Sequence, residues 1–140
     1  MKRGFVMSLQ SRNLMPDGLE YTINSICRHR SVEDVFIETS DQYSAIIEIE
    51  RKGFLSNIRA YVADVYILTV SDVEEVLSYY TDINCIVVIS NWDHYTVEAK
   101  NVAKENGVGV FTGKEFMEAL GKRGNQFLDT GFASKTERAM

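Results

Sequence analysis

The sequence predicts a single mixed α/β domain in which antiparallel strands come first and parallel strands follow. The chain has 140 residues, 45% apolar and 25% charged, which suffices for one core without a disulfide or metal. Three strand-like runs joined by short links are typical of an antiparallel meander. The second half alternates strand and helix, which requires parallel crossovers. Together these observations predict a mixed sheet flanked by helices.

The first element is a helix that follows the only proline, Pro16. Asp17 can cap this helix, and Glu20, three residues later, can reach back to the cap. Basic residues at 28–30 suit the negative C-terminal end of a helix. Apolar residues at helical spacing predict its buried face, which consists of Leu19, Ile23, Ile26 and Cys27.

Three runs rich in β-branched and aromatic residues come next and predict strands. They cover residues 32–39, 44–51 and 59–69. In the middle run Glu48 and Glu50 share a face with Ile46, because successive side chains of a strand point to opposite faces. The other face is apolar and is expected to join the core; it consists of Ala45, Ile47 and Ile49.

The second half opens with a helix that a capping box at 71–74 predicts. A near-continuous apolar run at 83–89 is typical of a strand covered on both faces. Thr96 can cap the following helix, which ends at Gly107. A short strand at 108–111 then leads to a second capping box.

That box, at 112–115, begins the last predicted helix, which Gly121 ends. We therefore expect one domain at residues 17–121, an N-terminal extension at 1–16 and a mobile tail at 122–140.

Acidic residues dominate the chain, whose formal net charge is -5. Residues 31–50 and 60–99 contain no lysine or arginine, so the middle of the chain would repel a phosphate backbone. The candidates for nucleic-acid contact therefore lie at the edges: Arg28, Arg30, Arg51, Lys52, Lys100 and Lys104. No apolar run is long enough for a membrane helix or a secretory core, and we expect a cytoplasmic protein without a membrane partner.

The segments at 85–90, 95–100 and 108–116 resemble the restriction-endonuclease-like fold, and within it the Mrr-type branch of the PD-(D/E)XK nucleases. Thr96, Ala99 and Ala103 keep the spacing of a helix in that branch. Residues 18–21 resemble the family's opening helix, which carries a glutamate, here Glu20. The likeness covers roughly residues 17–121 and implies the order α-β-β-β-α-β-α-β-α.

The resemblance also implies a metal site with an Asp on the second strand and an acidic residue or Gln on the third, followed two residues later by Lys. Mg²⁺ prefers such oxygen ligands and activates water. These positions fall at Ala45, Ala63 and Val65, and a shift of one residue offers Asp64 and Tyr66, still without the lysine. This degenerate site predicts a domain that has lost catalysis, needs no metal or cofactor, and binds DNA or a protein, including a second copy of itself.

In an alternative alignment with the nuclease pattern, the strand at 44–51 carries the catalytic motif and the chain is an enzyme. Glu48 and Glu50 would then form a Glu-x-Glu motif, with Asp41 or Asp34 as the further carboxylate and Glu20 from the first helix. The chain would be a DNA endonuclease dependent on Mg²⁺ or Mn²⁺. Otherwise the two glutamates are solvent-facing positions of an edge strand, kept charged to discourage aggregation.

A third hypothesis is a module that binds a small anion. The loop after the strand at 83–89 opens a helix, where α/β sheets usually place ligands and where free amide groups favour anions. Its candidate residues are Asn91, Trp92, His94, Thr96 and Lys100. The simpler explanation is that this loop packs over the end of the sheet.

Overall fold

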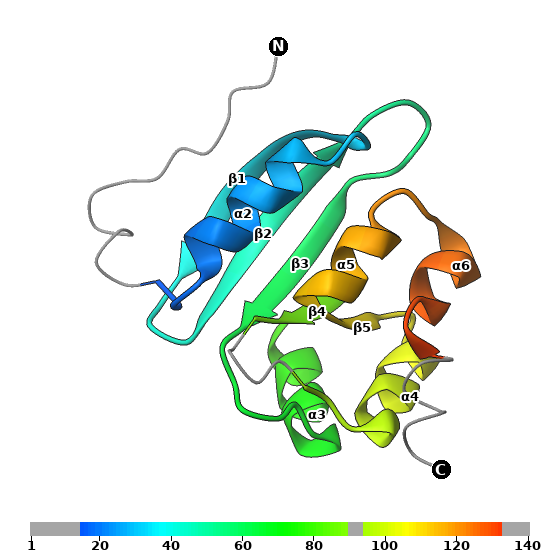
Figure 1. Ribbon diagram of the computed structural model, residues 1–140. Coiled ribbons are helices and arrows are strands. Elements are labelled where there is room, and N and C mark those ends of the chain that lie inside the picture. The colour runs from blue at the N-terminus through cyan, green and yellow to red at the C-terminus, as the bar shows by residue number, and fades with distance from the viewer. Residues whose placement is uncertain (1–14, 90–93, 133–140) are drawn as a thin grey trace.

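The computed structural model describes residues 15–89 and 94–132 and shows one five-stranded mixed sheet between two layers of helices (Figure 1). The strands lie in the order β1-β2-β3-β4-β5, the first two pairs antiparallel and the last two parallel. This confirms the predicted mixed sheet. Their bounds are β1 (Val32–Ser40), β2 (Ser44–Arg51), β3 (Ile58–Ala63), β4 (Cys85–Val88) and β5 (Gly109–Thr112).

The helices divide between the two faces of the sheet. One layer contains α2 (Leu19–Arg28), α5 (Gly113–Ala119) and α6 (Gly124–Asp129), and the other contains α3 (Val70–Tyr79) and α4 (Val97–Glu105). Each layer buries its own apolar cluster against the sheet. Within the described ranges, no helix is both long and apolar enough to cross a membrane.

Strand β2 shows how the sheet separates the two clusters. Ala45, Ile47 and Ile49 join the cluster under α2, whereas Ile46 joins the cluster under α3 and α4. Glu48 and Glu50 follow Ile46 on the second face and are half-buried. The predicted alternation of this strand is confirmed.

Two helix starts differ from the prediction. Helix α3 is capped by Thr69, whose hydroxyl accepts from the Asp72 backbone N–H (3.3 Å) while the Asp72 carboxylate accepts from the Thr69 N–H (2.9 Å). The box therefore begins two residues before Ser71. Helix α2 begins after Gly18 at φ 83°, without a side-chain cap from Asp17, because glycine readily adopts this left-handed conformation.

The third strand is shorter than predicted, because β3 ends at Ala63 instead of residue 69. Beyond it the chain turns away from the sheet and pairs once more, through hydrogen bonds from Leu68 N to His94 O and from Thr96 N to Leu68 O, both 3.0 Å. An apolar run can satisfy its backbone in such a bridge as well as in a ladder, so composition alone does not mark where the strand ends.

The expectation of a mobile tail at 122–140 is wrong for its first part. Residues 124–129 form α6, and Phe127 is buried with its ring 5.1 Å from that of Phe111. Residues 133–140, and residues 1–14 of the expected N-terminal extension, lie outside the described part of the chain.

Candidate functional site

Glu20 and Asp41 of the alternative nuclease register do not come together with Glu48 and Glu50, which share one face of β2. Glu20 is exposed on α2, and Asp41 lies in the turn between β1 and β2, where its carboxylate accepts from the backbone N–H groups of Tyr43 and Ser44 at 2.8 Å. Among the described residues, no group of three or more Asp, Glu, His or Cys side chains is arranged to hold a metal ion. The predicted metal set Asp41, Glu48 and Glu50 is therefore not assembled.

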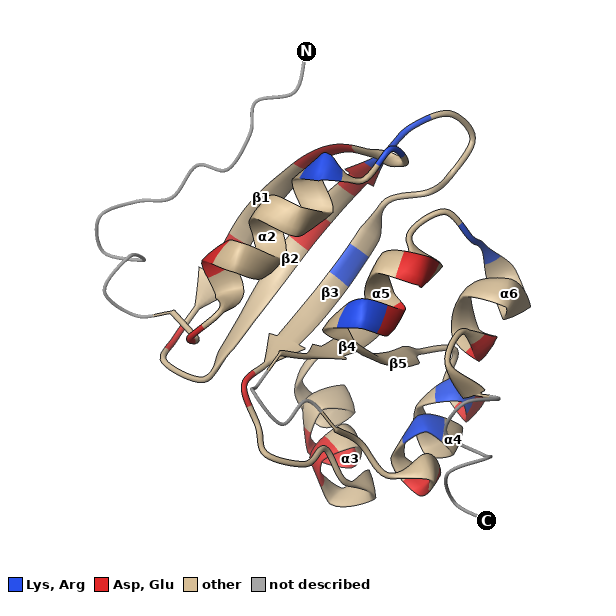
Figure 2. Ribbon diagram, viewed as in Figure 1, with Lys and Arg blue, Asp and Glu red and all other residues tan. Residues whose placement is uncertain are grey.

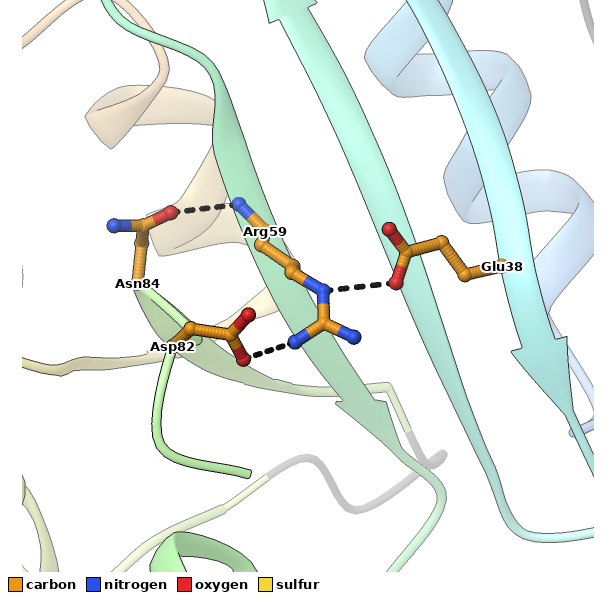
Figure 3. Close-up of polar contacts among 4 residues, drawn as sticks. All are labelled: Glu38, Arg59, Asp82 and Asn84. Carbon is orange, nitrogen blue, oxygen red and sulfur yellow. Dashed lines mark hydrogen bonds and ion pairs between the residues drawn. The ribbon is translucent and has the colours of Figure 1, made fainter. Parts of the chain in front are cut away.

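Glu48 instead belongs to a charged cluster on the open face of β1, β2 and β3. Arg59 stands opposite Glu48 in the β2–β3 register, donates from Nε to Glu38 at 2.8 Å, and pairs through Nη1 with Asp82 (Figure 3). Burial raises the pKa of Glu48, the nearby charge of Glu38 raises it further, and Arg59 acts in the opposite direction. Arg59 therefore interacts with three carboxylates, those of Glu38, Asp82 and Glu48. One carboxylate oxygen of Glu48, Oε2, is buried without a hydrogen-bond partner.

The positions that the nuclease resemblance assigns to metal ligands are apolar and closed. Ala45 is 2% exposed and Ala63 is 3% exposed. Ala45 pairs with Val62 in the β2–β3 register, and Ser44 pairs with Ala63, so the two alanines lie one step apart across neighbouring strands. Methyl groups offer no ligand atom to a metal ion.

Two of the six basic contact candidates are buried, which corrects their assignment to the surface. Lys100 is 1% exposed; its ammonium donates to the carbonyl of Val110 and lies 4.6 Å from the ring centroid of Phe111 and 5.0 Å from that of Tyr95. Arg51 is 9% exposed and donates to three backbone carbonyls. Lys100 is therefore not placed to contact a surface-bound polyanion, and Arg51 lines a small cavity instead of an open surface.

The other basic candidates lie at the surface. Arg28, Arg30 and Lys52 are exposed at one end of the molecule, where the Lys52 backbone N–H donates to Ser31 O at 2.9 Å. Lys104 forms an ion pair with Asp129 at 2.5 Å.

The anion-binding loop is described only in part, because Asn91 and Trp92 lie outside the described residues. His94 is exposed. The hydroxyl of Thr96 accepts from Ala99 N at 3.1 Å and so caps α4, as predicted. Together with the buried Lys100, this leaves no cationic side chain from the predicted set at the start of α4.

A groove that the sequence analysis did not identify lies between the β1–β2 turn, the end of β3 and helix α3. Its volume is about 620 Å³, within the range of ligand sites in proteins. Four tyrosines line it, Tyr43, Tyr61, Tyr79 and Tyr80, together with the acidic residues Asp41, Asp72 and Glu75. No lysine or arginine is among the described residues that line it. We refer to it as the tyrosine groove.

The floor of the tyrosine groove brings aromatic and acidic groups together. The rings of Tyr61 and Tyr80 lie 5.6 Å apart. Burial raises the pKa of Tyr61; hydrogen bonding with Ser44 lowers it, and the charges of Asp41 and Glu75 raise it. The groove therefore combines partly desolvated rings with negative charge, and the acidic α3 that forms its wall carries no basic residue (Figure 2).

The comparisons with known proteins identify no relative. No protein-family model, no curated protein and no solved structure matches the chain.

Proposed function

We propose that the chain is a non-catalytic binding module on a nuclease-like scaffold and that its tyrosine groove binds a protein partner. The observation that carries the proposal is the groove itself, a recess of about 620 Å³ with four tyrosines and three carboxylates. The loss of catalysis rests on the nuclease resemblance, for which Ala45 and Ala63 occupy the positions of metal ligands. A cytoplasmic location is part of the same proposal.

The distribution of charge favours a protein partner over DNA. A protein that binds a phosphate backbone presents several exposed lysines or arginines on one surface. Of the six candidates here, Arg51 and Lys100 are buried and Lys104 is paired with Asp129, so three remain exposed, namely Arg28, Arg30 and Lys52. The tyrosine groove is acidic, so it repels phosphate and attracts positive charge.

The partner that suits the groove is a segment that carries arginine or lysine. A guanidinium or ammonium group is attracted both to the face of a tyrosine ring and to nearby carboxylates. The groove is open rather than closed, and its rim residues Tyr43 and Tyr79 are 62% and 76% exposed. Exposed tyrosines are typical of protein interfaces, because they combine a large apolar area with a polar tip. A second copy of the chain is one possible source of such a segment.

A peptide titration tests the proposal. The probe is an unstructured twelve-residue peptide with three arginines among Gly and Ser, and its control replaces each arginine with the neutral isostere citrulline. We expect the arginine peptide to shift the amide resonances of the groove in a ¹H–¹⁵N NMR spectrum and the citrulline peptide to shift them far less. Equal binding of both peptides would contradict a cation site.

Matched variants locate the binding. Glu75→Lys changes an acid that lines the groove, whereas Glu74→Lys makes the same change on the neighbouring, exposed residue of α3. Tyr79→Ser and Tyr21→Ser each remove a ring that is 76% exposed, but only Tyr79 lines the groove. We expect Glu75→Lys and Tyr79→Ser to weaken the arginine peptide several-fold and the two controls to change it less than twofold. An equal loss in the controls would place binding elsewhere.

A further inference from the structure

A second, smaller cavity lies at the opposite end of β2 from the tyrosine groove. It has a volume of about 170 Å³ and is formed by the β2–β3 loop, the segment before β4, the turn before β5 and the start of α6. Its polar lining comes from Arg51, Ser56, Asn57, Asn84 and Arg123. No aspartate or glutamate is among the described residues that line it, although the chain as a whole is acidic.

Arg51 places a buried positive charge at this cavity. Its side chain donates from Nε to Ser56 O at 2.6 Å and from Nη1 to Leu120 O at 3.0 Å and Lys122 O at 2.7 Å. These acceptors are neutral, and none of the ion pairs among the described residues includes Arg51. Burial lowers the pKa of Arg51, but a guanidinium stays charged in proteins. Buried charges are normally paired with an opposite charge, and the described part of the chain supplies none to Arg51.

The position of Arg51 follows from the alternation of β2. Ala45, Ile47 and Ile49 face the cluster under α2, and Arg51 is the next residue on that face. Its guanidinium carbon lies 6.0 Å from the ring centroid of Phe127, so α6 covers one side of the charge. The guanidinium is thus fixed in place before any ligand arrives, which reduces the entropy lost on binding.

Each of the other polar side chains of the residues that line the cavity includes a hydrogen-bond donor. Arg123, which is exposed, contributes a second guanidinium from the residue before α6. Asn84 accepts from the backbone N–H of Arg59 at 2.7 Å through its amide oxygen, and its amide nitrogen points away from Arg59 (Figure 3). The amide nitrogen of Asn84, the amide of Asn57 and the hydroxyl of Ser56 are therefore donors available to an anion.

We propose that this cavity binds a tetrahedral oxyanion of the size of a phosphoryl group, with Arg51 and Arg123 as its two cationic contacts. Arg51 has Nη2 left to donate, because its Nε and Nη1 are bonded to backbone carbonyls. Arg123 can offer the planar arginine fork, which donates two parallel hydrogen bonds to a phosphate. The volume exceeds the roughly 30 Å³ of one water molecule several times but lies below the ~300 Å³ typical of the smallest drug-sized sites. The proposal is independent of the tyrosine groove, which shares no lining residue with this cavity.

The test is a titration of the full chain with inorganic phosphate at constant ionic strength, followed by ¹H–¹⁵N NMR that includes the arginine Nε–H groups. We expect phosphate to shift the Nε–H signal of Arg51 and the backbone signals of residues 56, 57 and 124, and chloride to leave them in place. Arg123→Gln is expected to weaken phosphate at least fivefold. Lys122→Gln removes the same charge from the neighbouring exposed residue, which does not line the cavity, and is expected to change the affinity less than twofold.

The source of the phosphoryl group is found with two DNA oligonucleotides that differ only in a 5′-phosphate. Binding of the phosphorylated strand that is tighter than that of both the unphosphorylated strand and inorganic phosphate would identify a nucleic-acid end. Equal binding of the two strands would identify free phosphate. The proposal is overturned if phosphate shifts no signal at the cavity, if chloride causes the same shifts, or if Lys122→Gln and Arg123→Gln weaken binding equally. The arginine-peptide titration tests the groove at the other end of β2. The outcome of the phosphate titration therefore neither supports nor contradicts the proposed function of the groove.

Discussion

Lys100 is 1% exposed, although lysine side chains normally lie at the surface. Its ammonium lies near the rings of Tyr95 and Phe111 and donates to the Val110 carbonyl. The sequence held a signal for this burial, because position 100 lies on the same helical face as Ala103 and next to Ala99, both 0% exposed. The alternation of β2 likewise indicated that Arg51 is buried, because position 51 follows Ala45, Ile47 and Ile49 on the buried face. At both positions, residue type suggested the surface while periodicity pointed to the interior.

We expect Lys100→Ala to lower the free energy of unfolding by about 2 kcal/mol or more, because it removes a buried stem and one donor to the Val110 carbonyl. Urea unfolding followed by circular dichroism measures the change. Lys104→Ala on the same helix removes a surface ion pair with Asp129 and a contact between the partly exposed ammonium and the Phe132 ring, and is expected to change the free energy of unfolding by less than about 1 kcal/mol. Equal effects would show that Lys100 is not part of the core.

The raised pKa of Glu48 makes a prediction about pH. A carboxyl whose pKa is higher in the folded state binds more protons there, so folding is favoured below the raised pKa and stability is lost as pH rises from about 4.5 through it. We expect Glu48→Gln to remove this loss, so that the variant gains stability relative to the parent chain as pH rises. Thermal unfolding between pH 4 and pH 8 measures it. Parallel pH profiles for the two proteins would contradict the account.

At the scale of elements, sequence motifs within one helical turn predicted where α4 and α5 begin. Helix α6 depends on packing between residues that are not neighbours in the sequence. Thr96 and the box at 112–115 were identified because both partners of each hydrogen bond lie within one turn. Helix α6 was missed because its six residues are too few for a periodic pattern and its start has no side-chain cap. Its stability comes from the rings of Phe127 and Phe111, which lie far apart in the sequence.

Phe127→Ala is expected to destabilise the chain by about 3 kcal/mol, because it opens a cavity beside Phe111 and uncovers one side of Arg51. Gln126→Ala, at an exposed position of the same helix, is expected to stay within about 0.5 kcal/mol. Chemical unfolding of both variants provides the comparison. A neutral Phe127→Ala would mean that α6 is dispensable, as the predicted mobile tail implied.

At the scale of the whole molecule, two recesses of opposite charge lie at the two ends of β2. The tyrosine groove includes Ser44, where the strand begins, and the oxyanion cavity includes Arg51, where it ends. At about 3.4 Å per residue the eight-residue strand separates them by roughly 25 Å, well beyond the Debye length of ~8 Å at physiological salt. Neither recess could be predicted from sequence alone, because the walls of each come from segments that only the folded sheet brings together.

This separation predicts that the two sites act independently. We expect saturating phosphate to change the dissociation constant of the arginine peptide less than twofold at 0.15 M salt, because screening removes most of the attraction between the two sites. Calorimetric titrations of the peptide with and without phosphate measure the coupling. A change of tenfold or more would show that the two ligands compete or that the sheet transmits a conformational change.

The central proposal is that the chain binds without cutting: under the nuclease resemblance Ala45 and Ala63 stand at the positions of metal ligands, and Asp41, Glu48 and Glu50 do not converge. Its most direct test is incubation of the purified chain with plasmid and single-stranded DNA in Mg²⁺ or Mn²⁺, beside the double variant Glu48→Ala/Glu50→Ala. We predict that neither protein cleaves either substrate. Metal-dependent cleavage by the parent chain that the double variant abolishes would contradict the account and place a working active site on β2.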